Sequence, residues 1–255
     1  MRSLLTAAAI SLAFTLFLTP VFLRLFRRWG WGQVIRTPDD IRNPSHGEKR
    51  GTPTMGGTIF IAGTIIGYLV GGVAGNNPPT VSGLLVLWMM VGFGTVGFID
   101  DFMKVRSQRS LGLSGWRKIV GQVIVAVPFG IVALNFPNIY NETPASPYIS
   151  VFRDVQVLWF FALGPILGWL LYLAWISFIG VAASNSVNVS DGLDGLAAGA
   201  GIFVVGAYSL IAFWQFNQAC FGGGELSPGG LSACYATRDP FDLAIVSAAF
   251  VGALV

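Results

Sequence analysis

The acidic residues of this chain are few, and two of them, Asp100 and Asp101, directly follow a long apolar run that ends at Ile99. Carboxylates beside so apolar a segment are costly to place and are usually functional. The alternative is a solvated helix end at which an aspartate pairs with Lys104 at helical spacing. The pair by itself is compatible with a reactive carboxylate site or with an ordinary helix terminus.

A second polar cluster ends a stretch that is uncharged from Val155 to Ser190. Its members are two asparagines and two aspartates, each three residues from the next: Asn185, Asn188, Asp191 and Asp194. In a helix, successive members would rotate by about −60° and the set would span about 13 Å of the axis. Carboxylate and amide oxygens are hard ligands that suit Mg²⁺, which usually binds a few protein oxygens together with substrate phosphates. The spacing therefore favours a diphosphate–metal site.

Two glycines, Gly192 and Gly195, interrupt this second cluster. They indicate a partly unwound segment, in which the backbone can approach a ligand closely. The alternative is a packing loop in which Ser190 and Asp191 cap helices.

Two further segments combine basic and polar side chains. The segment from Lys49 to Gly57, which includes Thr54, opens the second apolar run, and its cations, hydroxyls and amides suit phosphate oxygens. Lys118 and Gln122 stand four residues apart where the fourth apolar run begins. Each segment is a weak signal alone, because Lys and Arg are expected beside membrane helices. Four polar clusters on one membrane face together favour phosphate chemistry.

Long apolar runs must position these clusters. Hydrophobic residues make up 54% of the chain and charged residues 11%, whereas a soluble domain carries about 25% charged residues. A bilayer core about 30 Å thick requires about 20 apolar residues per helix. Six runs without a charged residue reach about that length: Leu4–Leu23, Met55–Gly75, Val81–Ile99, Ile119–Phe136, Val157–Ala183 and Leu196–Phe216. The sequence therefore predicts an all-α, polytopic transmembrane helix bundle.

The last apolar run, Leu243–Val255, has 13 residues, and that is too few to span a bilayer. We expect six complete spans and a truncated seventh. The chain is thus expected to be a C-terminally truncated fragment that forms one transmembrane domain, residues 1–255.

The basic residues predict the orientation. Of the 15 Lys and Arg residues, seven lie in the linker 24–54 and five in the segment 100–118. Because Lys and Arg are retained on the cytoplasmic side, the N-terminus should lie outside and both acidic clusters should face the cytoplasm. The formal charge of +3 thus reflects topology, and no nucleic-acid partner is expected. The basic loops could attract anionic membrane lipids.

Two of the outer loops carry further signals. The loop 135–156 is rich in Pro and Asn, which are turn residues, and a small hairpin could fit there. Cys220 and Cys234 share another outer loop, where the oxidising compartment would permit a disulfide. Two cysteines alone leave that bridge open.

Four motifs resemble those of the polyprenyl-phosphate N-acetylhexosamine-1-phosphate transferases. They are Gly51-Thr52-Pro53-Thr54-Met55-Gly56-Gly57, Gly97-Phe98-Ile99-Asp100-Asp101, Lys118-x-x-x-Gln122 and Asn185-x-x-Asn188-x-x-Asp191-Gly-Leu-Asp194-Gly-Leu-Ala. The resemblance runs in order along almost the whole chain. The acidic motifs are shared across that superfamily, whereas the string from Thr52 to Gly57 and the expected hairpin are similar to the phospho-N-acetylmuramoyl-pentapeptide transferase branch.

The resemblance implies a reaction and its partners. Undecaprenyl phosphate would attack UDP-N-acetylmuramoyl-pentapeptide to give lipid I and UMP in peptidoglycan synthesis, with Mg²⁺ as cofactor. The enzyme would lie in the bacterial inner membrane with a cytoplasmic active site, and a homodimer is left open. A further aspartate motif and a histidine-rich loop of the family would lie beyond residue 255.

The resemblance also implies residue roles. Catalysis would involve Asp100, Asp101 and Lys118. The metal would be held by Asp100 and Asn188. Substrate would be contacted by a set of five residues: Lys49, Thr54, Asn185, Asp191 and Asp194.

Three alternatives differ in what they require. A sister transferase for UDP-N-acetylglucosamine would share the acidic motifs but not the string from Thr52 to Gly57. A CDP-alcohol phosphotransferase needs an Arg where Gly199 stands, and it needs two later aspartates, none of which occurs before Asp239. An ion-coupled transporter would place carboxylates near the membrane midplane with repeat symmetry, whereas here they lie at helix ends.

Overall fold

A computed structural model describes residues 1–32, 55–107, 112–138, 141–150, 154–190, 195–220, 234 and 237–255. Within them, six helices are long and apolar enough to cross a membrane: α1 (Arg2–Arg28), α2 (Gly57–Ala74), α3 (Val81–Ser107), α4 (Gly115–Asn135), α5 (Pro165–Ser190) and α6 (Leu196–Asn217). A shorter apolar helix, α7 (Pro240–Leu254), follows. The predicted all-α bundle with six spans and a shorter seventh helix is confirmed.

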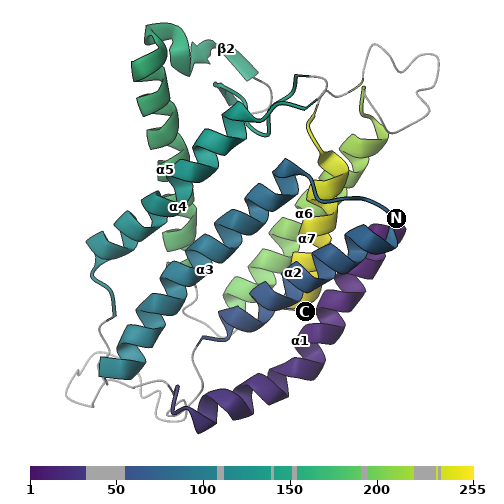
Figure 1. Ribbon diagram of the computed structural model, residues 1–255, viewed down its shortest axis with the longest axis vertical. Coiled ribbons are helices and arrows are strands. Elements are labelled where there is room, and N and C mark those ends of the chain that lie inside the picture. Colours follow the sequence, from purple (N-terminus) through teal and green to yellow (C-terminus); the bar gives the residue numbers. More distant parts are fainter. Residues whose placement is uncertain are drawn as a thin grey trace.

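The hairpin expected in the loop 135–156 is present. Strands β1 (Tyr148–Ser150) and β2 (Asp154–Trp159) pair antiparallel, with Tyr148 opposite Trp159. The hairpin lies beside the N-terminal end of α5 in Figure 1.

The predicted start of the fifth span is wrong. Val157–Trp159 belongs to β2, a short 3-10 helix η2 (Phe160–Leu163) follows, and α5 begins only at Pro165. Gly164, at φ +95°, makes the break, and Pro165 suits the first turn of a helix because its missing N–H has no intrahelical acceptor there. An apolar run has the same appearance whether it is extended or helical, so hydrophobicity could not locate this boundary.

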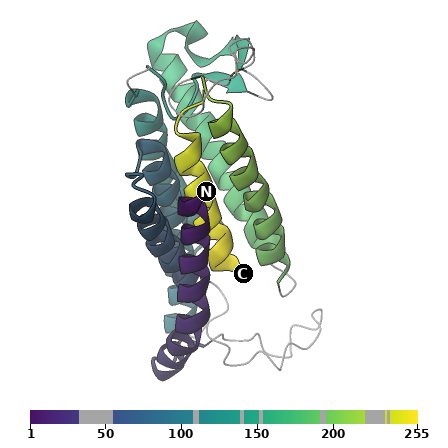
Figure 2. The ribbon, with the colours of Figure 1, turned by 90° about the vertical axis from the view of Figure 1, so that its right-hand side faces the viewer.

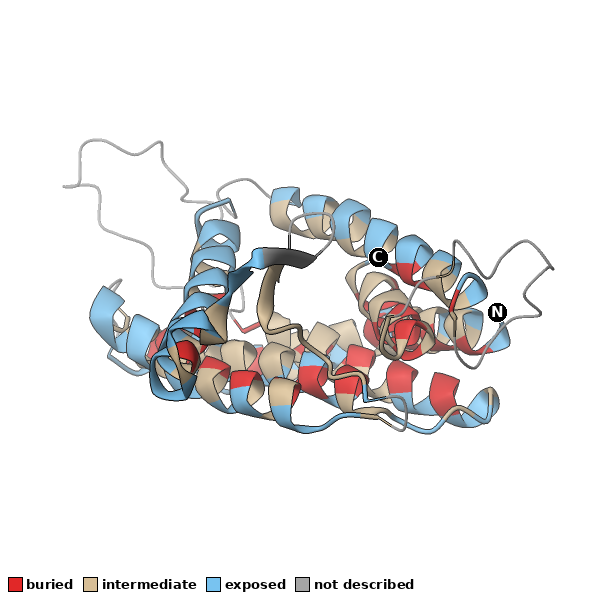
Figure 3. Ribbon diagram, turned by 90° about the horizontal axis from the view of Figure 1, so that it is seen from above, coloured by how far each residue is buried: buried red, intermediate tan, exposed pale blue. Residues whose placement is uncertain are grey.

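The helices form two connected groups (Figures 1 and 2). In one, α1 lies against α2 and α7, and α6 lies against α7; in the other, α4 lies between α3 and α5. Helices α2 and α7 both contact α3 and so connect the two groups. Buried side chains gather where α1, α2, α3 and α7 meet, in a core of Ala7, Tyr68, Leu87, Ile245, Val246 and Ala249 (Figure 3).

Small residues allow α1 and α2 to approach closely. Gly67 and Gly71 of α2 face Ser11 and Ala7 of α1, and a Cβ at Gly71 would lie 2.6 Å from the Cβ of Ala7. The Ser11 hydroxyl donates to the Gly63 carbonyl at 3.0 Å. In a lipid environment, helix association depends on such close packing and on hydrogen bonds between helices. This contact orients α2, which contributes to the cavity described below.

At the opposite end from the acidic pair, Asp242 of α7 joins three elements. Its Oδ2 accepts hydrogen bonds from the Tyr68 hydroxyl at 2.9 Å and from the Thr80 amide at 3.0 Å and hydroxyl at 2.6 Å. Asp242 is 6% exposed. Three hydrogen bonds stabilise this buried carboxylate and hold α7 against α2 and the start of α3.

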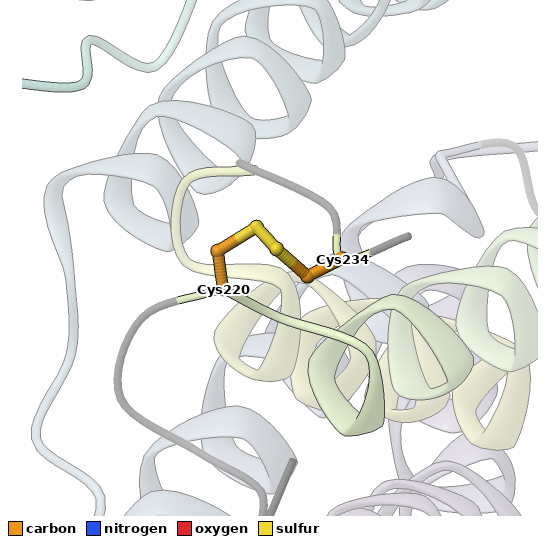
Figure 4. Close-up of a disulfide and its surroundings, with 2 residues drawn as sticks. All are labelled: Cys220 and Cys234. Carbon is orange, nitrogen blue, oxygen red and sulfur yellow. A yellow bond between two sulfur atoms is a disulfide. The ribbon is translucent and has the colours of Figure 1, made fainter. Parts of the chain in front are cut away.

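The cysteines form a disulfide at this same end (Figure 4). Cys220 follows α6 and Cys234 precedes α7, with the two Cα atoms 5.0 Å apart. The bridge, which the sequence left open, therefore links the ends of two neighbouring helices.

Candidate active site

A cavity of about 230 Å³ lies between α2, α3, α4 and α5. It is lined by the N-terminal parts of α2 and α4 and by the C-terminal parts of α3 and α5. The lining part of α5 is the end opposite the hairpin in Figure 1. Its polar lining comprises Thr58, Asp100, Asp101, Lys118, Gln122, Ser184, Asn185 and Asn188. All four polar segments identified in the sequence thus contribute residues to one cavity, although the segment from Lys49 to Gly57 does so through Met55 and Gly57 and not through its cations.

Asp100 is the most enclosed charged group of this cavity, at 4% exposure. Its Oδ2 lies 2.7 Å from Nζ of Lys104 and 3.1 Å from Nζ of Lys118. Its Oδ1 accepts a hydrogen bond from the Leu113 amide at 2.7 Å. Burial of a carboxylate is costly unless it is paired and hydrogen-bonded, and here two cations and an amide satisfy it.

The segment before α4 reaches Asp100 because Gly112 has no side chain. A Cβ at Gly112 would overlap Asp100 Oδ1 and would lie 2.8 Å from its Cγ. The close approach brings the amide of Leu113 to the carboxylate. Asp100 thereby holds the start of α4 and, through Lys118, its first turn against α3.

Asp101 differs from its neighbour in exposure and in partners. Its side chain is 36% exposed, and its Oδ1 pairs with Nζ of Lys104 at 2.9 Å. The alternative interpretation of the two aspartates is a helix end at which an aspartate forms an ion pair with Lys104. That ion pair is present. It coexists with a cavity that both aspartates line.

Amide side chains connect α4 with α5. Gln122, 4% exposed, donates to the Ser184 hydroxyl at 3.0 Å and accepts from Asn185 Nδ2 at 3.1 Å. Asn185 also donates to the Val181 carbonyl at 2.8 Å. Asn188, one turn further along α5, is exposed and lines the cavity. These bonds fix the Asn185 side chain and leave that of Asn188 facing the cavity.

The structure brings together Asp100, Asp101, Lys118, Asn185 and Asn188. The other predicted site residues, Lys49, Thr54, Asp191 and Asp194, lie outside the described residues. Two of them adjoin the cavity in sequence, because Thr54 precedes the lining residue Met55 and Asp191 follows the end of α5. Of the two glycines expected to unwind the second cluster, Gly195 has φ +81° at the start of α6, and Gly192 lies outside the described residues.

Sequence reasoning missed Ser184 and the backbone of Gly112 and Leu113. Ser184 directly precedes Asn185, so its place at the end of an apolar run was the available signal. No residue-type signal marks the Leu113 amide, because any residue except Pro can supply that donor.

The lining offers oxygen ligands of the type that Mg²⁺ prefers. Within the described part of the chain, no group of three or more His, Cys, Asp or Glu side chains is placed to hold a metal. Oxygen atoms of Asp101 and Asn188 nonetheless share the cavity with Asp100. This donor set fits an ion that binds one or two protein carboxylates and takes its remaining ligands from substrate phosphates and water.

Comparison with known proteins gives two family matches. Residues 83–255 match the model of glycosyl transferase family 4, and residues 49–61 match phospho-N-acetylmuramoyl-pentapeptide-transferase signature 1. The second match includes Lys49 and Thr54.

Curated relatives match over nearly the whole chain. The phospho-N-acetylmuramoyl-pentapeptide-transferase of Clavibacter sepedonicus is 52% identical over 262 residues, covering 100% of this chain and 69% of the relative. The proteins of the same name from Beutenbergia cavernae and Streptomyces griseus are 46% and 47% identical over 253 residues; each match covers 99% of this chain, and 68% and 67% of the relatives.

Proposed function

Because the chain belongs to glycosyl transferase family 4 and to the phospho-N-acetylmuramoyl-pentapeptide-transferase family, we propose that it transfers phospho-N-acetylmuramoyl-pentapeptide from UDP to undecaprenyl phosphate. The products are lipid I and UMP, as in peptidoglycan synthesis. The observation that carries this proposal is the cavity at which Asp100, Asp101, Lys118 and Asn188 meet from three helices.

The reaction exchanges one P–O bond for another. An oxygen of the lipid phosphate attacks the β-phosphorus of UDP-N-acetylmuramoyl-pentapeptide, and the bond from that phosphorus to the oxygen of the α-phosphate breaks. UMP leaves with the electron pair of that bond. Because the second pKa of a phosphate monoester is about 6, the acceptor is largely dianionic near neutral pH. Positioning and charge compensation therefore matter more here than a general base.

The charges around the acidic pair are already balanced. Asp100 and Asp101 contact Lys104 and Lys118, so two carboxylates face two ammonium groups. An incoming phosphate and a diphosphate then require further positive charge to offset their mutual repulsion. We assign that role to Mg²⁺ and to the basic segment around Lys49.

Asp101 and Asn188 would hold the metal. Both line the cavity, and each is at least partly exposed. Asp100 would join them only by giving up one of its two ammonium partners. When bound, Mg²⁺ supplies charge neutralisation at the diphosphate and at the leaving UMP. Asp100 itself positions Lys118, whose ammonium group lies at the cavity beside the incoming phosphate.

The nucleotide would be held beside this cavity. The family signature includes Lys49 and Thr54, and we assign both to contacts with the nucleotide or its phosphates. Asn185 is fixed by Gln122 at the cavity wall and would contact the substrate there. Asp191 and Asp194 would line the uridine and diphosphate cleft beyond the end of α5.

We place the protein in the bacterial inner membrane, with its N-terminus outside and the cavity facing the cytoplasm. Two features support this orientation. The acidic end of α3 lies within the basic segment 100–118. The disulfide lies near the start of α7, which contacts the opposite end of α3. Disulfides persist in oxidising compartments, so the two features agree.

The muramoyl substrate is preferred to that of the sister branch, because the cited relatives share its name and the chain contains its signature. The test uses the intact gene product in detergent with undecaprenyl phosphate and Mg²⁺. It is offered UDP-N-acetylmuramoyl-pentapeptide and UDP-N-acetylglucosamine separately, and UMP and lipid product are measured.

We expect UMP from the muramoyl substrate alone, loss of UMP release with EDTA, and recovery on adding Mg²⁺. Release from UDP-N-acetylglucosamine instead would assign the protein to the sister branch. Release from neither substrate by a folded protein would overturn the proposal and favour a transporter. Activity that persists in EDTA would remove the metal from the mechanism.

A further inference from the structure

The cavity beside the acidic pair has two chemically different halves. Its polar half consists of the carboxylates, Lys118 and the amide side chains described above. Its apolar half is formed by Phe60 and Ile61 of α2 with Phe93 and Val96 of α3. Phe93 precedes Asp100 by seven residues, and this places it about 10 Å further along α3. Because α3 is apolar up to Ile99, the apolar half extends from the acidic pair into the membrane-spanning part of the bundle.

The volume of the cavity indicates which part of a ligand can lie wholly inside it. At about 230 Å³ it lies below the range of about 300–1,000 Å³ that is typical of pockets for drug-sized ligands. A nucleotide joined to a sugar and a pentapeptide is far larger than such a ligand. A phosphate group with the first few carbons of a chain is small enough to fit. The cavity can therefore hold the head of the lipid acceptor, whereas the nucleotide donor must extend beyond it.

The border between the two halves has the charge that such a ligand requires. Nζ of Lys118 lies 3.1 Å from Asp100, and the Lys118 side chain is 22% exposed, so its remaining N–H donors can reach a ligand in the cavity. An ammonium group is a suitable point charge for a phosphate oxygen. A lipid phosphate seated at Lys118 would direct its chain along the apolar half.

Gly97 stands at this border. Phe93, Gly97 and Asp101 are spaced by four residues on α3 and share one face of the helix, and all three line the cavity. A Cβ built on Gly97 meets no atom within 4 Å, whereas a Cβ on Gly94 would overlap the side chain of Ile61. A side chain at Gly94 would therefore require the end of the Ile61 side chain to move, while the absence of a side chain at Gly97 leaves open space in the cavity.

We propose that the apolar half of the cavity binds the first isoprene units of the lipid phosphate acceptor, and that Gly97 determines the access of this chain by leaving the border open. The proposal rests on the proposed transfer to a prenyl phosphate, and it adds where the acceptor lies and which residue admits it.

Photolabelling tests the location without depending on turnover. The intact protein is irradiated with a prenyl phosphate that carries a diazirine in its first isoprene unit, and the labelled peptides are identified by mass spectrometry. We expect label in residues 57–61 and 93–97, and we expect unlabelled prenyl phosphate to compete with it. A prenyl alcohol and a phosphatidylglycerol with the same diazirine serve as controls for lipid that enters without recognition of its head group.

Label confined to other segments would overturn the proposed location. Equal labelling of residues 57–61 and 93–97 by the prenyl alcohol or by phosphatidylglycerol would overturn it too, because the apolar half would then bind any lipid chain. If the wild-type protein releases no UMP with any donor, the proposed reaction fails, yet the labelling result still decides whether a prenyl phosphate binds here.

Substitution at Gly97 tests the role of the open space. Since no atom lies within 4 Å of a Cβ at Gly97 and glycine is a poor helix former, Gly97→Ala and Gly97→Leu should fold with a thermal midpoint no lower than that of the wild type. We expect Gly97→Leu to raise the KM for the prenyl phosphate at least about tenfold, the scale on which apolar pockets discriminate small differences in size. The KM for the nucleotide donor should stay within twofold.

A matched control is Gly206→Leu in α6. No atom lies within 4 Å of a Cβ at that position either, and Gly206 does not line the cavity. It should change neither KM value nor the labelling. An acceptor KM for Gly97→Leu within twofold of wild type would overturn the role of Gly97, and so would an equal rise in both KM values.

Discussion

Substitutions of the two adjacent aspartates should affect turnover and stability differently. Asp101→Asn is the more informative change, because it should lower turnover with little loss of stability. Asp101 and Lys104 are each 36% exposed, and Lys104 keeps its contact with Asp100 at 2.7 Å when Asp101 is neutralised. An exposed ion pair of this kind contributes about 0.2–1 kcal/mol to the free energy of unfolding. The thermal midpoint should therefore fall by no more than about 4 °C.

Turnover of Asp101→Asn should fall far more. The substitution removes a negative charge at the cavity and replaces the carboxylate that we assign to the metal with a neutral amide, whose oxygen binds the ion less strongly. Removal of one preorganised electrostatic group from an active site typically costs about 10²–10³ in kcat. We expect a loss of at least that size, measured as UMP release at saturating substrates and normalised to folded protein.

Asp100→Asn is the contrasting variant. The oxygen of the new amide could still accept the hydrogen bond from the Leu113 N–H. The amide NH₂ group, however, would replace Oδ2 and would then face the ammonium groups of Lys104 and Lys118, which are also hydrogen-bond donors. Unsatisfied buried donors cost about 1–3 kcal/mol. Asp100→Asn should therefore lose stability and turnover together.

Thermal unfolding in detergent, followed alongside the assay, distinguishes the two variants. Near-normal turnover of Asp101→Asn would remove Asp101 from the mechanism. Equal losses of stability in both variants would refute the distinction that rests on their different burial.

Three further changes test the fold. Asp242→Asn should lower the free energy of unfolding by about 1–3 kcal/mol, because its buried carboxylate accepts three hydrogen bonds; a denaturation curve checks this, and turnover per folded molecule should stay within twofold. Removing the disulfide by Cys220→Ser should lower the free energy of unfolding by about 3 kcal/mol, as expected for a loop of about 15 residues. In intact cells, a membrane-impermeant reductant should reduce the wild-type disulfide. Reduction only after lysis would contradict the proposed orientation. Gly67→Ala should destabilise by about 1–3 kcal/mol, since its Cβ would overlap Ser11 Oγ; an unchanged thermal midpoint would contradict this packing.

The spans could be predicted because the bilayer imposes one length and one composition on every crossing helix. Five of the six apolar runs correspond closely to helices, such as Val81–Ile99 within α3. The run that began at Val157 failed because a hydrophobic strand and a hydrophobic helix are alike in composition, and Gly164 and Pro165 set the boundary locally.

The sequence by itself determined which residue types could do chemistry here. A bilayer protein has few charged groups to place, so carboxylates and amides that recur at one end of its apolar runs are informative. That argument identified Asp100, Asp101, Asn185 and Asn188 before any contact was known, and motif resemblance assigned Lys118 to the same set.

Only the tertiary structure decided how these residues differ. Asp100 is enclosed because the chain returns over it at Gly112 and because α4 brings Lys118 to it, whereas Asp101, the next residue on the same helix, remains half-exposed. Adjacent helical residues point about 100° apart, so their surroundings depend on which helices pack on each side. That packing joins residues far apart in the chain, and no local pattern around two identical aspartates could specify it.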